Sequence, residues 1–365
     1  MTITRREALK VSAPLLAIPW CISCAKIEDG LNIYSWADYI GETTIADFSK
    51  ISGIKVNYDT YNSTPEMEAK MLAGSTGYDV VIHSGVTLRD FVKAGVYDRL
   101  DKRRLPNWKN LDPAVLSIAS GYNQDNAYGV PYMWGSTGMT YNLDMVRQRL
   151  PDADLESLDT ILDPANASRL ADCGISLLDD QSLIWEVMSY LGKPQDVYTK
   201  AVMDDVVKTV KRIRPYVRTF DSSNFLVSLP NKEMCAVNNW SGDYATARRR
   251  AKEAGVDINL GYFVPKTRSP AWVDMYCIVS DGLNKNNAYK FLSYMMIPEV
   301  IAQCTNHIKY ANANLASRKF VDRSVLDDPT IYPTRDVLAR LYAPKSLSAA
   351  DSRLINDALN AIKAG

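Results

Sequence analysis

The alternation of strand and helix patterns between residues 30 and 94 is the feature that most restricts how this chain can fold. Three short apolar or alternating stretches indicate strands, and stretches with helical periodicity and capping signals separate and follow them. The expected strands are 30–34, 54–58 and 78–82, and the expected helices are 44–51, 63–74 and 87–94. Strands and helices at this spacing form βαβ units around a parallel sheet, so the sequence predicts the α/β class. Ligands bind beyond the carboxyl ends of such strands, where Trp36 and Ser84 lie.

A combination of Trp, Asp and Tyr recurs at expected strand ends in residues 34–39, 239–244 and 272–276. Three copies predict one site with flat aromatic walls and acidic ends. A cation with an apolar body suits such a site, because ring faces attract positive charge and carboxylates accept charge-assisted hydrogen bonds from N–H donors. The alternative is that each Trp is a core or lid residue and each Asp forms a turn.

Composition narrows the possible functions. The chain has 365 residues, enough for two domains. The chain has 42 basic residues (Lys and Arg) and 42 acidic residues (Asp and Glu). The absence of a basic excess argues against a nucleic-acid partner. The sequence holds only two histidines, His83 and His307, so a histidine metal site is poorly supplied. It also lacks phosphate-loop, dinucleotide, zinc-protease and nucleophile-elbow motifs. We therefore expect no cofactor, no metal and no catalysis, and keep an exported enzyme acting on an amine as an alternative.

Residues 1–25 resemble an export signal. Arg5 and Arg6 resemble a twin-arginine motif, and the apolar segment that follows, up to Cys24, is too short for a stable membrane anchor. Cys24 is a candidate lipid-attachment site, and simple cleavage is the alternative. Export leads to an oxidising compartment, which allows disulfides. Spacing alone does not choose among the three full pairings of the remaining cysteines, which are Cys173, Cys235, Cys277 and Cys304.

Two extended segments are candidates for crossings between domains. Residues 129–139 are apolar and broken by glycines, and residues 256–263 are the second candidate. Further helices are expected at 159–170, 182–191, 202–212, 245–253, 284–296 and 351–363, with a strand at 174–178.

Taken together, these segments resemble the periplasmic polyamine-binding proteins of ABC transporters, the putrescine and spermidine class. The resemblance extends from about Leu31 to residues 332–333, which is most of the expected mature chain. The segments that carry it are 33–40, 71–81, 131–134, 240–243 and 310–314.

The resemblance implies a two-lobe periplasmic solute-binding fold, with the ligand in a cleft between α/β lobes joined by crossing strands. The implied first lobe comprises residues 29–136 and 259–304, and the second comprises 137–258 and 305–365. The implied partners are a polyamine and the membrane permease of an ABC transporter, and the protein is expected to be a periplasmic monomer. A sensing role beside a membrane receptor is the alternative function.

The resemblance also assigns roles to particular residues. Three tryptophans are implied to wall the cleft, two aspartates to bind amines, and further residues to add polar contacts. The implied ligand-binding set is Trp36, Asp38, Tyr39, Ser84, Asp180, Trp240, Asp243, Trp272, Asp274 and Tyr310. Cys173 and Cys235 match positions that form a disulfide in some relatives.

Two departures from the family pattern affect the choice of ligand. Ala37 stands where relatives carry Ser or Thr, and Leu183 or Ser182 stands where they carry a Glu in the second lobe. Asp180 matches an acidic residue of the spermidine-binding branch. We therefore expect a triamine such as spermidine to bind better than putrescine, because a short diamine needs a carboxylate at each end.

Overall fold

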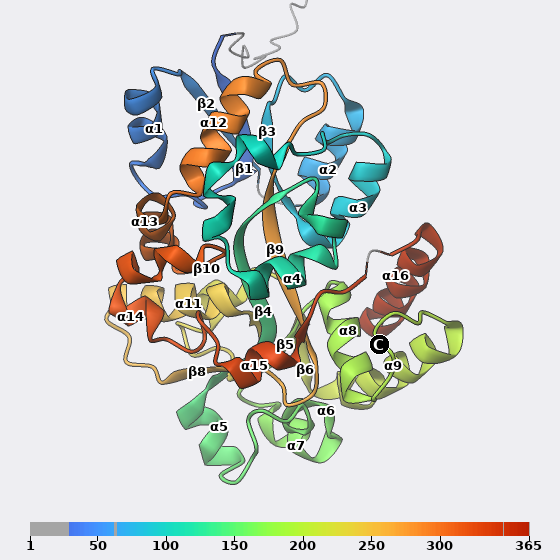
Figure 1. Ribbon diagram of the computed structural model, residues 1–365. Coiled ribbons are helices and arrows are strands. Elements are labelled where there is room, and N and C mark those ends of the chain that lie inside the picture. The colour runs from blue at the N-terminus through green and yellow to red at the C-terminus, as the bar shows by residue number, and fades with distance from the viewer. Residues whose placement is uncertain (1–28, 62–63, 346, 365) are drawn as a thin grey trace, which may run out of the picture.

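The computed structural model describes residues 29–61, 64–345 and 347–364. The expected export signal and Cys24 lie outside this range. An 11-stranded sheet runs through the whole molecule, with the main order β2-β1-β3-β9-β4-β7-β5-β6. β8 and β10 are added along β4, and β11 is added along β9. The described fold is of the α/β class, as the strand and helix pattern predicts, and has the two lobes that the resemblance implies (Figure 1).

The expected βαβ pattern is confirmed in the first lobe. β1 (Leu31–Trp36) lies between β2 (Val56–Tyr61) and β3 (Val80–Ser84), and all three are parallel. The helices that alternate with them are α1 (Thr44–Ser52), α2 (Thr64–Ala73) and α3 (Gly85–Lys93). The second and third strands begin two residues later than expected.

Two long antiparallel neighbours occupy the centre of the sheet. Every residue of β4 (Val130–Asn142) is buried, and β9 (Ser269–Ile278) pairs with it and with β3. In Figure 1 these two strands run through the middle of the molecule, between its upper and lower parts. The expected crossing at 256–263 is wrong. Its strand β8 (Leu260–Phe263) pairs only with the end of β4, and β9 makes the return.

The second lobe repeats the parallel arrangement. β5 (Ile175–Leu177) lies between β6 (Val217–Phe220) and β7 (Ala236–Trp240). Its helices are α5 (Leu143–Arg149), α6 (Asp159–Leu162), α7 (Pro164–Leu170), α8 (Gln181–Tyr190), α9 (Lys200–Ile213), α10 (Phe225–Ser228) and α11 (Ser241–Glu253). Cys173 and Cys235, which flank β5 and β7, form a disulfide with their Cα atoms 5.4 Å apart. That pairing confirms the expectation, and Cys277 and Cys304 are free and buried.

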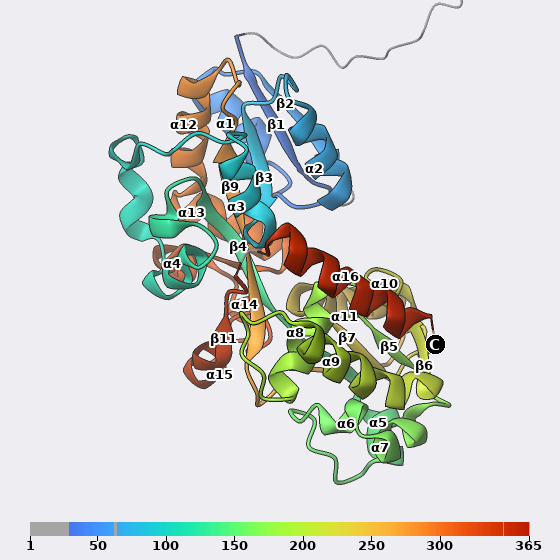
Figure 2. The same ribbon diagram turned by 90° about the vertical axis from the view of Figure 1, so that its right-hand side faces the viewer.

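The remaining elements link the two lobes and complete them. They are α4 (Pro113–Ser120), α12 (Lys285–Met295), α13 (Pro298–Ile308), β10 (Ala311–Asn312), α14 (Arg323–Leu326), α15 (Arg335–Arg340), β11 (Leu341–Tyr342) and α16 (Ala349–Lys363). Short 3-10 helices lie at Lys102–Arg104, Pro106–Asn110, Gln124–Asn126, Arg214–Tyr216 and Leu315–Phe320. α16 packs on α8 and α9 (Figure 2). The lobe boundaries stay a prediction, because β4 and β9 belong to one continuous sheet and β10 pairs with β4 at Met133 and Trp134.

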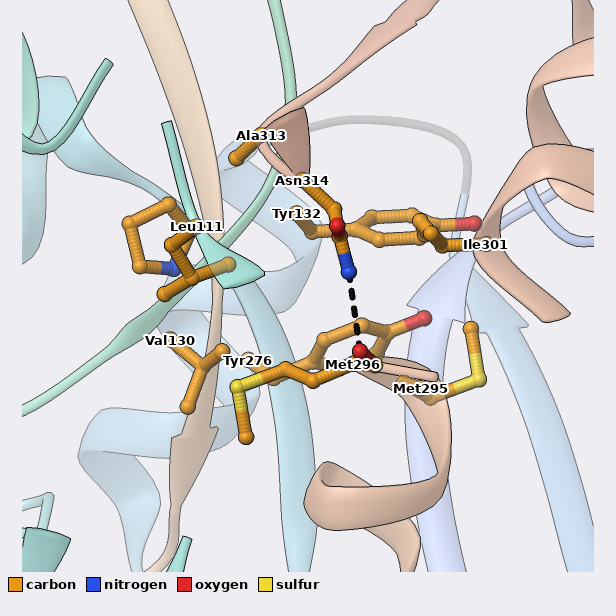
Figure 3. Close-up of a pocket in the computed structure, with 10 residues that line it drawn as sticks. Leu111, Val130, Tyr132, Tyr276, Met295, Met296, Ile301, Ala313 and Asn314 are labelled. Atoms are coloured by element: carbon orange, nitrogen blue, oxygen red, sulfur yellow. Dashed lines mark hydrogen bonds between the residues drawn. The ribbon is translucent and has the colours of Figure 1, made fainter. Parts of the chain in front are cut away.

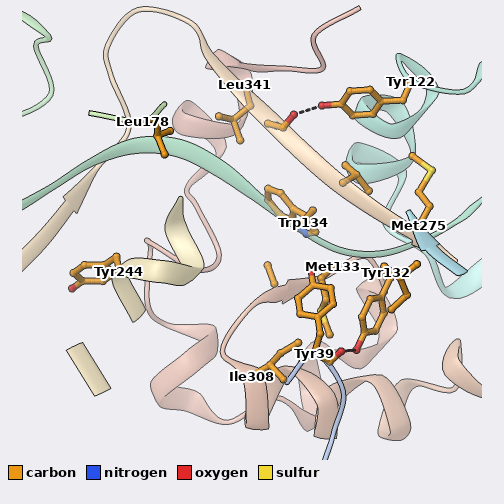
Figure 4. Close-up of a cluster of buried hydrophobic side chains, with 14 of the residues drawn as sticks. Tyr39, Tyr122, Tyr132, Met133, Trp134, Leu178, Tyr244, Met275, Ile308 and Leu341 are labelled. Carbon is orange, nitrogen blue, oxygen red and sulfur yellow. Dashed lines mark hydrogen bonds between the residues drawn. The ribbon is translucent and has the colours of Figure 1, made fainter. Parts of the chain in front are cut away.

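Buried tyrosines join the elements near the crossing strands. The hydroxyl of Tyr132 donates to the carbonyl oxygen of Tyr39 at 2.8 Å, and Tyr122 donates to the carbonyl oxygen of Ala271 (Figure 4). These hydroxyls satisfy backbone oxygens that would otherwise be buried without partners. None of the helices in the described ranges combines the length and the apolar character that a membrane crossing requires.

Candidate ligand-binding site

The candidate site lies where β1, β3 and β7 end, on either side of the central strands β9 and β4. Trp36, Ser84 and Trp240 are the last residues of β1, β3 and β7, and each is half-buried. Within the sheet, Ser84 is directly opposite Asp274 of β9. The parallel strands therefore deliver these side chains to the edge where α/β sheets bind ligands.

Asp274 is held by the turn that follows β1. The hydroxyl of Tyr39 donates to Oδ2 of Asp274 at 2.9 Å, and Asp274 is only 7% exposed. Asp38 adopts a left-handed backbone with φ of 53°, which Asp tolerates better than most residues, and the turn returns Tyr39 towards β9. The side chain of Asp38 itself is exposed.

Asp243 is held by Tyr310 at the beginning of α11. The Tyr310 hydroxyl donates to Oδ1 of Asp243 at 3.3 Å. The Tyr310 ring lies so close to Gly242 that a Cβ there would meet ring carbons at 1.9 Å. Gly242 is thus required for the close approach of the ring to the helix.

An aromatic series connects the two acidic positions. Tyr310 packs edge to face on Trp272 with centroids 5.5 Å apart, and on Tyr39 with centroids 5.7 Å apart. Gly135 in β4 leaves room for the Trp272 indole, since a Cβ at that position would lie 2.4 Å from it. The Trp272 Nε1 has no hydrogen-bond partner among the described residues. The rings of Tyr39, Tyr310 and Trp272 therefore lie between the carboxyl groups of Asp274 and Asp243.

Burial changes the electrostatics of both aspartates. It raises the pKa of Asp243 to about 7, while the Tyr310 hydroxyl, Arg250 and the Trp240 backbone act in the opposite direction. Burial also raises the pKa of Asp274 to about 7, and the Tyr39 hydroxyl lowers it. The ionised form of such a carboxyl is poorly solvated, so a nearby cation stabilises it strongly. The arrangement can bind ammonium groups.

The structure brings six of the ten expected residues together around Asp274, by direct contact or by pairing in the sheet, and the other four have different neighbours. Tyr39, Asp274, Tyr310, Asp243 and Trp272 are linked by hydrogen bonds and ring contacts, and Ser84 adjoins them by its strand register. Trp36 packs on Tyr61, with ring centroids 4.4 Å apart. Trp240 contributes its backbone to Asp243. Asp180 begins α8, where its Oδ1 accepts from the backbone N–H of Ser182 at 2.8 Å.

The sequence-based site list leaves out a buried acid in the second lobe. Glu186 lies in α8 and is 2% exposed, and Oε2 of its carboxyl accepts a 2.5 Å hydrogen bond from Nδ2 of Asn238 in β7. A charged residue within the apolar run Leu183 to Met188 is the signal that could have found it.

A separate apolar pocket belongs to the core of the first lobe. Figure 3 shows Leu111, Val130, Tyr276 and Met296 around it, with Asn314 donating from Nδ2 to the Met296 carbonyl oxygen at 2.8 Å. None of the expected site residues lines this pocket, so we assign it no ligand.

The bacterial extracellular solute-binding protein family matches residues 43–333 of this sequence. The chain belongs to that family. The match spans both lobes and all five mutually linked residues except Tyr39, which precedes it. The two-lobe architecture is the one that the resemblance implies.

Named relatives and solved structures agree with this assignment. The chain is 40% identical over 342 residues to the putrescine-binding periplasmic protein PotF of Escherichia coli, covering 92% of this chain and 91% of the relative. It is 28% identical over 364 residues to the spermidine/putrescine-binding periplasmic protein of Escherichia coli, covering 97% of each. The crystal structure of the spermidine/putrescine ABC transporter substrate-binding protein PotD from Streptococcus pneumoniae superposes with a TM-score of 0.81 at 22% identity, covering 92% of this chain and 99% of that one. This last likeness shows the fold.

Proposed function

We propose that the protein captures a polyamine in the periplasm and delivers it to the permease of an ABC transporter. The observation that carries the proposal is a pair of aspartates, the half-buried Asp243 and the buried Asp274, each of which accepts a hydrogen bond from a tyrosine hydroxyl. A polyamine supplies what such a site lacks, which is a positive charge on an apolar chain. Relatives with up to 40% identity are named for putrescine and for spermidine, which supports this ligand class.

In this proposal each expected residue has its own role in binding the polyamine. Asp243 and Asp274 hold ammonium groups, and Trp36, Trp240 and Trp272 stack on the methylenes. Ser84, Asp38, Tyr39 and Tyr310 orient the ligand or the aspartates. Binding closes the lobes about β4 and β9, because ligand contacts with both lobes favour the closed state. The lobes then comprise residues 29–136 with 259–304, and 137–258 with 305–365.

Export through the twin-arginine route, with cleavage or a lipid anchor at Cys24, is part of the same proposal, as is a monomeric state. The supporting observations are Arg5, Arg6 and the apolar segment after them. No catalytic step is proposed.

Among polyamines we propose a triamine such as spermidine ahead of putrescine. Asp180 offers a further carboxylate at the beginning of α8, whereas Ser182 and Leu183 in the first turn carry no charge. An ammonium that leaves water without a partner is penalised by several kcal/mol, so a short diamine is served less well. Since several relatives are named for putrescine, putrescine is the ligand to compare.

Calorimetry of the ligand-free mature protein tests the function. We expect binding of spermidine and putrescine, and no binding of an uncharged chain of the same length such as a diol. Failure of every di- and triamine to bind overturns the proposed function. Putrescine displacing spermidine at equal or lower concentration overturns the ligand preference alone.

A further inference from the structure

One threonine holds both ends of the turn that carries Tyr310. The residue that caps the end of α13, Lys309, has a left-handed backbone with φ of 62°, and its N–H donates to the carbonyl oxygen of Thr305 at 2.8 Å. Three residues later, Nδ2 of Asn312 donates to Oγ1 of the same threonine at 2.8 Å. Residues 309–312 therefore form a short turn that is attached to Thr305 before and after Tyr310.

The amide of Asn312 is fixed in orientation, because all four of its hydrogen-bonding positions are used. Its Oδ1 accepts from the backbone N–H of Asn314 at 2.8 Å and from the hydroxyl of Ser317 at 2.9 Å. Besides Thr305, its Nδ2 donates to the hydroxyl of Tyr332 at 3.3 Å. Two acceptor and two donor positions are the full capacity of a side-chain amide. A rotation of this amide would break all of these bonds, so the second attachment of the turn is firm.

Both attachments lie in the interior, against the crossing strand β4. Thr305 and Asn312 are 0% and 3% exposed. Asn312 is opposite Met133 in the sheet, and its carbonyl oxygen accepts from Nε1 of Trp134 at 3.2 Å. The Thr305 hydroxyl lies 3.9 Å from Sδ of the same Met133. The turn is thus mounted on α13 and β4, and neither Thr305 nor Asn312 belongs to the expected ligand-binding set.

The position of the Tyr310 phenol allows little error. Its ring lies against Gly242, where a Cβ would meet ring carbons at 1.9 Å. Its hydroxyl donates to Oδ1 of Asp243 at 3.3 Å. O–H···O hydrogen bonds are usually about 2.5–3.0 Å long, so a shift of the phenol away from Asp243 soon loses this bond. The attachment of the turn therefore decides whether Asp243 keeps its donor.

We propose that Thr305 and Asn312 are positioning residues for the candidate site: they hold residues 309–312 so that the Tyr310 hydroxyl reaches Asp243, and they contribute to polyamine affinity without touching the ligand. The inference rests on the proposed polyamine function. A tyrosine that is already held in the ligand-free protein loses no side-chain freedom when the ligand binds, and such pre-organisation strengthens binding. Since Asp243 serves any amine in the proposed function, the effect is common to diamines and triamines.

Calorimetric titration of Thr305→Val with spermidine and putrescine tests the positioning role. Valine keeps the shape of threonine and removes the Oγ1 that accepts from Asn312. The net contribution of one hydrogen bond corresponds to about fivefold, and we expect that loss of affinity for both ligands. Thr305→Ser, which keeps the hydroxyl, should bind within about twofold of wild type.

Thr160→Val is the matched control. It removes a similarly buried hydroxyl, which donates to the carbonyl oxygen of Asp154 at 2.9 Å in the second lobe, and it should keep wild-type affinity. Wild-type affinity in Thr305→Val, or an equal loss in Thr160→Val, overturns the proposal. In a Tyr310→Ala background no phenol remains to be positioned, so Thr305→Val should then change affinity by less than about twofold. A loss that persists there shows that Thr305 acts by another route, and also overturns the proposal.

A second measurement needs no ligand. Gly242→Ala forces its Cβ against the Tyr310 ring, and the cost depends on how firmly that ring is held. We expect the fall in urea midpoint caused by Gly242→Ala to be roughly halved, or smaller still, when Thr305→Val is present. A threonine that only stabilises the fold would lower the midpoint by itself and leave the cost of Gly242→Ala unchanged, which would overturn the proposal. If the wild-type protein binds no polyamine, the proposed function fails instead, and this comparison still decides whether Thr305 holds Tyr310.

Discussion

The hydroxyl of Tyr39 donates a 2.9 Å hydrogen bond to Oδ2 of Asp274, and this bond joins the turn after β1 to β9 across 235 positions of sequence. On the other side of the aromatic series, Tyr310 makes the equivalent bond to Asp243. Each carboxyl thus has one phenol as a donor, which leaves further acceptor capacity for an ammonium group.

Replacing either aspartate by asparagine should weaken polyamine binding strongly. Removing one charge from a buried hydrogen-bonded pair typically costs about 2–5 kcal/mol, which is roughly 30-fold to several-thousand-fold in affinity. Calorimetry of Asp243→Asn and Asp274→Asn measures the loss, and unchanged far-UV circular dichroism shows that the fold is intact. Asp327→Asn, whose side chain is 65% exposed, is the control. If both site variants bind within about threefold of wild type, the assignment of these residues is wrong.

Tyr39→Phe should weaken binding in a pH-dependent way. The hydroxyl lowers the pKa of Asp274, so its removal leaves that carboxyl protonated to higher pH. A hydrogen bond to a charged group contributes about 1.5–3 kcal/mol. We expect a roughly tenfold or larger loss of affinity at pH 7 and a smaller loss at pH 8.5, measured by titration at both values. An identical loss at both values would show that the hydroxyl contacts only the ligand.

Ligand affinity in the wild-type protein should rise with pH between about 6 and 8. The pKa values of Asp243 and Asp274 in the ligand-free protein are about 7, and an ammonium group binds the ionised forms. Below pH 7 the ligand must displace protons, which costs affinity up to tenfold per pH unit for each protonated carboxyl. Titrations across this range measure the slope, and a flat profile contradicts the prediction.

The folding stability of the ligand-free protein should change with pH in the opposite direction, and fall as pH rises. Folding raises the pKa of these aspartates, so the folded state binds protons more tightly than the unfolded chain. Their stabilising contribution is complete below the unfolded pKa near 4 and is lost as pH rises through about 7. Urea unfolding at pH 5 and pH 8 checks this sign, and spermidine should restore more stability at pH 8 than at pH 5.

Gly242→Ala should destabilise the protein even though Gly to Ala in a helix is normally favourable. The new Cβ would lie 1.9 Å from the Tyr310 ring, so the ring must move. Overpacking typically costs about 1–3 kcal/mol, measured by denaturant unfolding. In a Tyr310→Ala background the same substitution should become neutral or stabilising. A cost that persists in that background shows that the clash with Tyr310 is not its cause.

Loss of the Cys173–Cys235 bridge should lower stability by about 2–5 kcal/mol. The double Cys→Ala variant and the reduced wild type should unfold at similar urea concentrations, and reductant should not affect the variant. Non-reducing peptide mapping of the exported protein should find free thiols at Cys277 and Cys304. Free thiols at Cys173 and Cys235 in that map would refute the bridge.

The sequence predicts the parallel βαβ units well because their signals are local. Gly53, in a left-handed conformation, ends α1, and the apolar residues after Tyr78 make β3 recognisable. The strands that cross between the lobes are harder to predict, because their pairing is not local. Both candidate crossings are extended in the sequence pattern, and only the register of β9 with β3 and β4 shows which segment returns.

The candidate site likewise has features that local sequence predicts and features that it does not. The Trp, Asp and Tyr stretches could be found by inspection, but the pairing of Tyr39 with Asp274, and of Tyr310 with Gly242, depends on contacts between distant segments. The sequence does not show whether the single acid Glu186 in an apolar helix faces solvent or the interior, and only the structure shows that it is buried.

Because the sheet passes from β2 to β6 without a break, the two lobes share one hydrogen-bonded ladder through β4 and β9. Linked domains that make few contacts melt separately, whereas a shared ladder couples their stability. This protein should therefore unfold in one cooperative transition, and neither half should be a foldable fragment. A mutation buried in either lobe would then lower the abundance of the whole protein, even where it leaves the binding residues untouched.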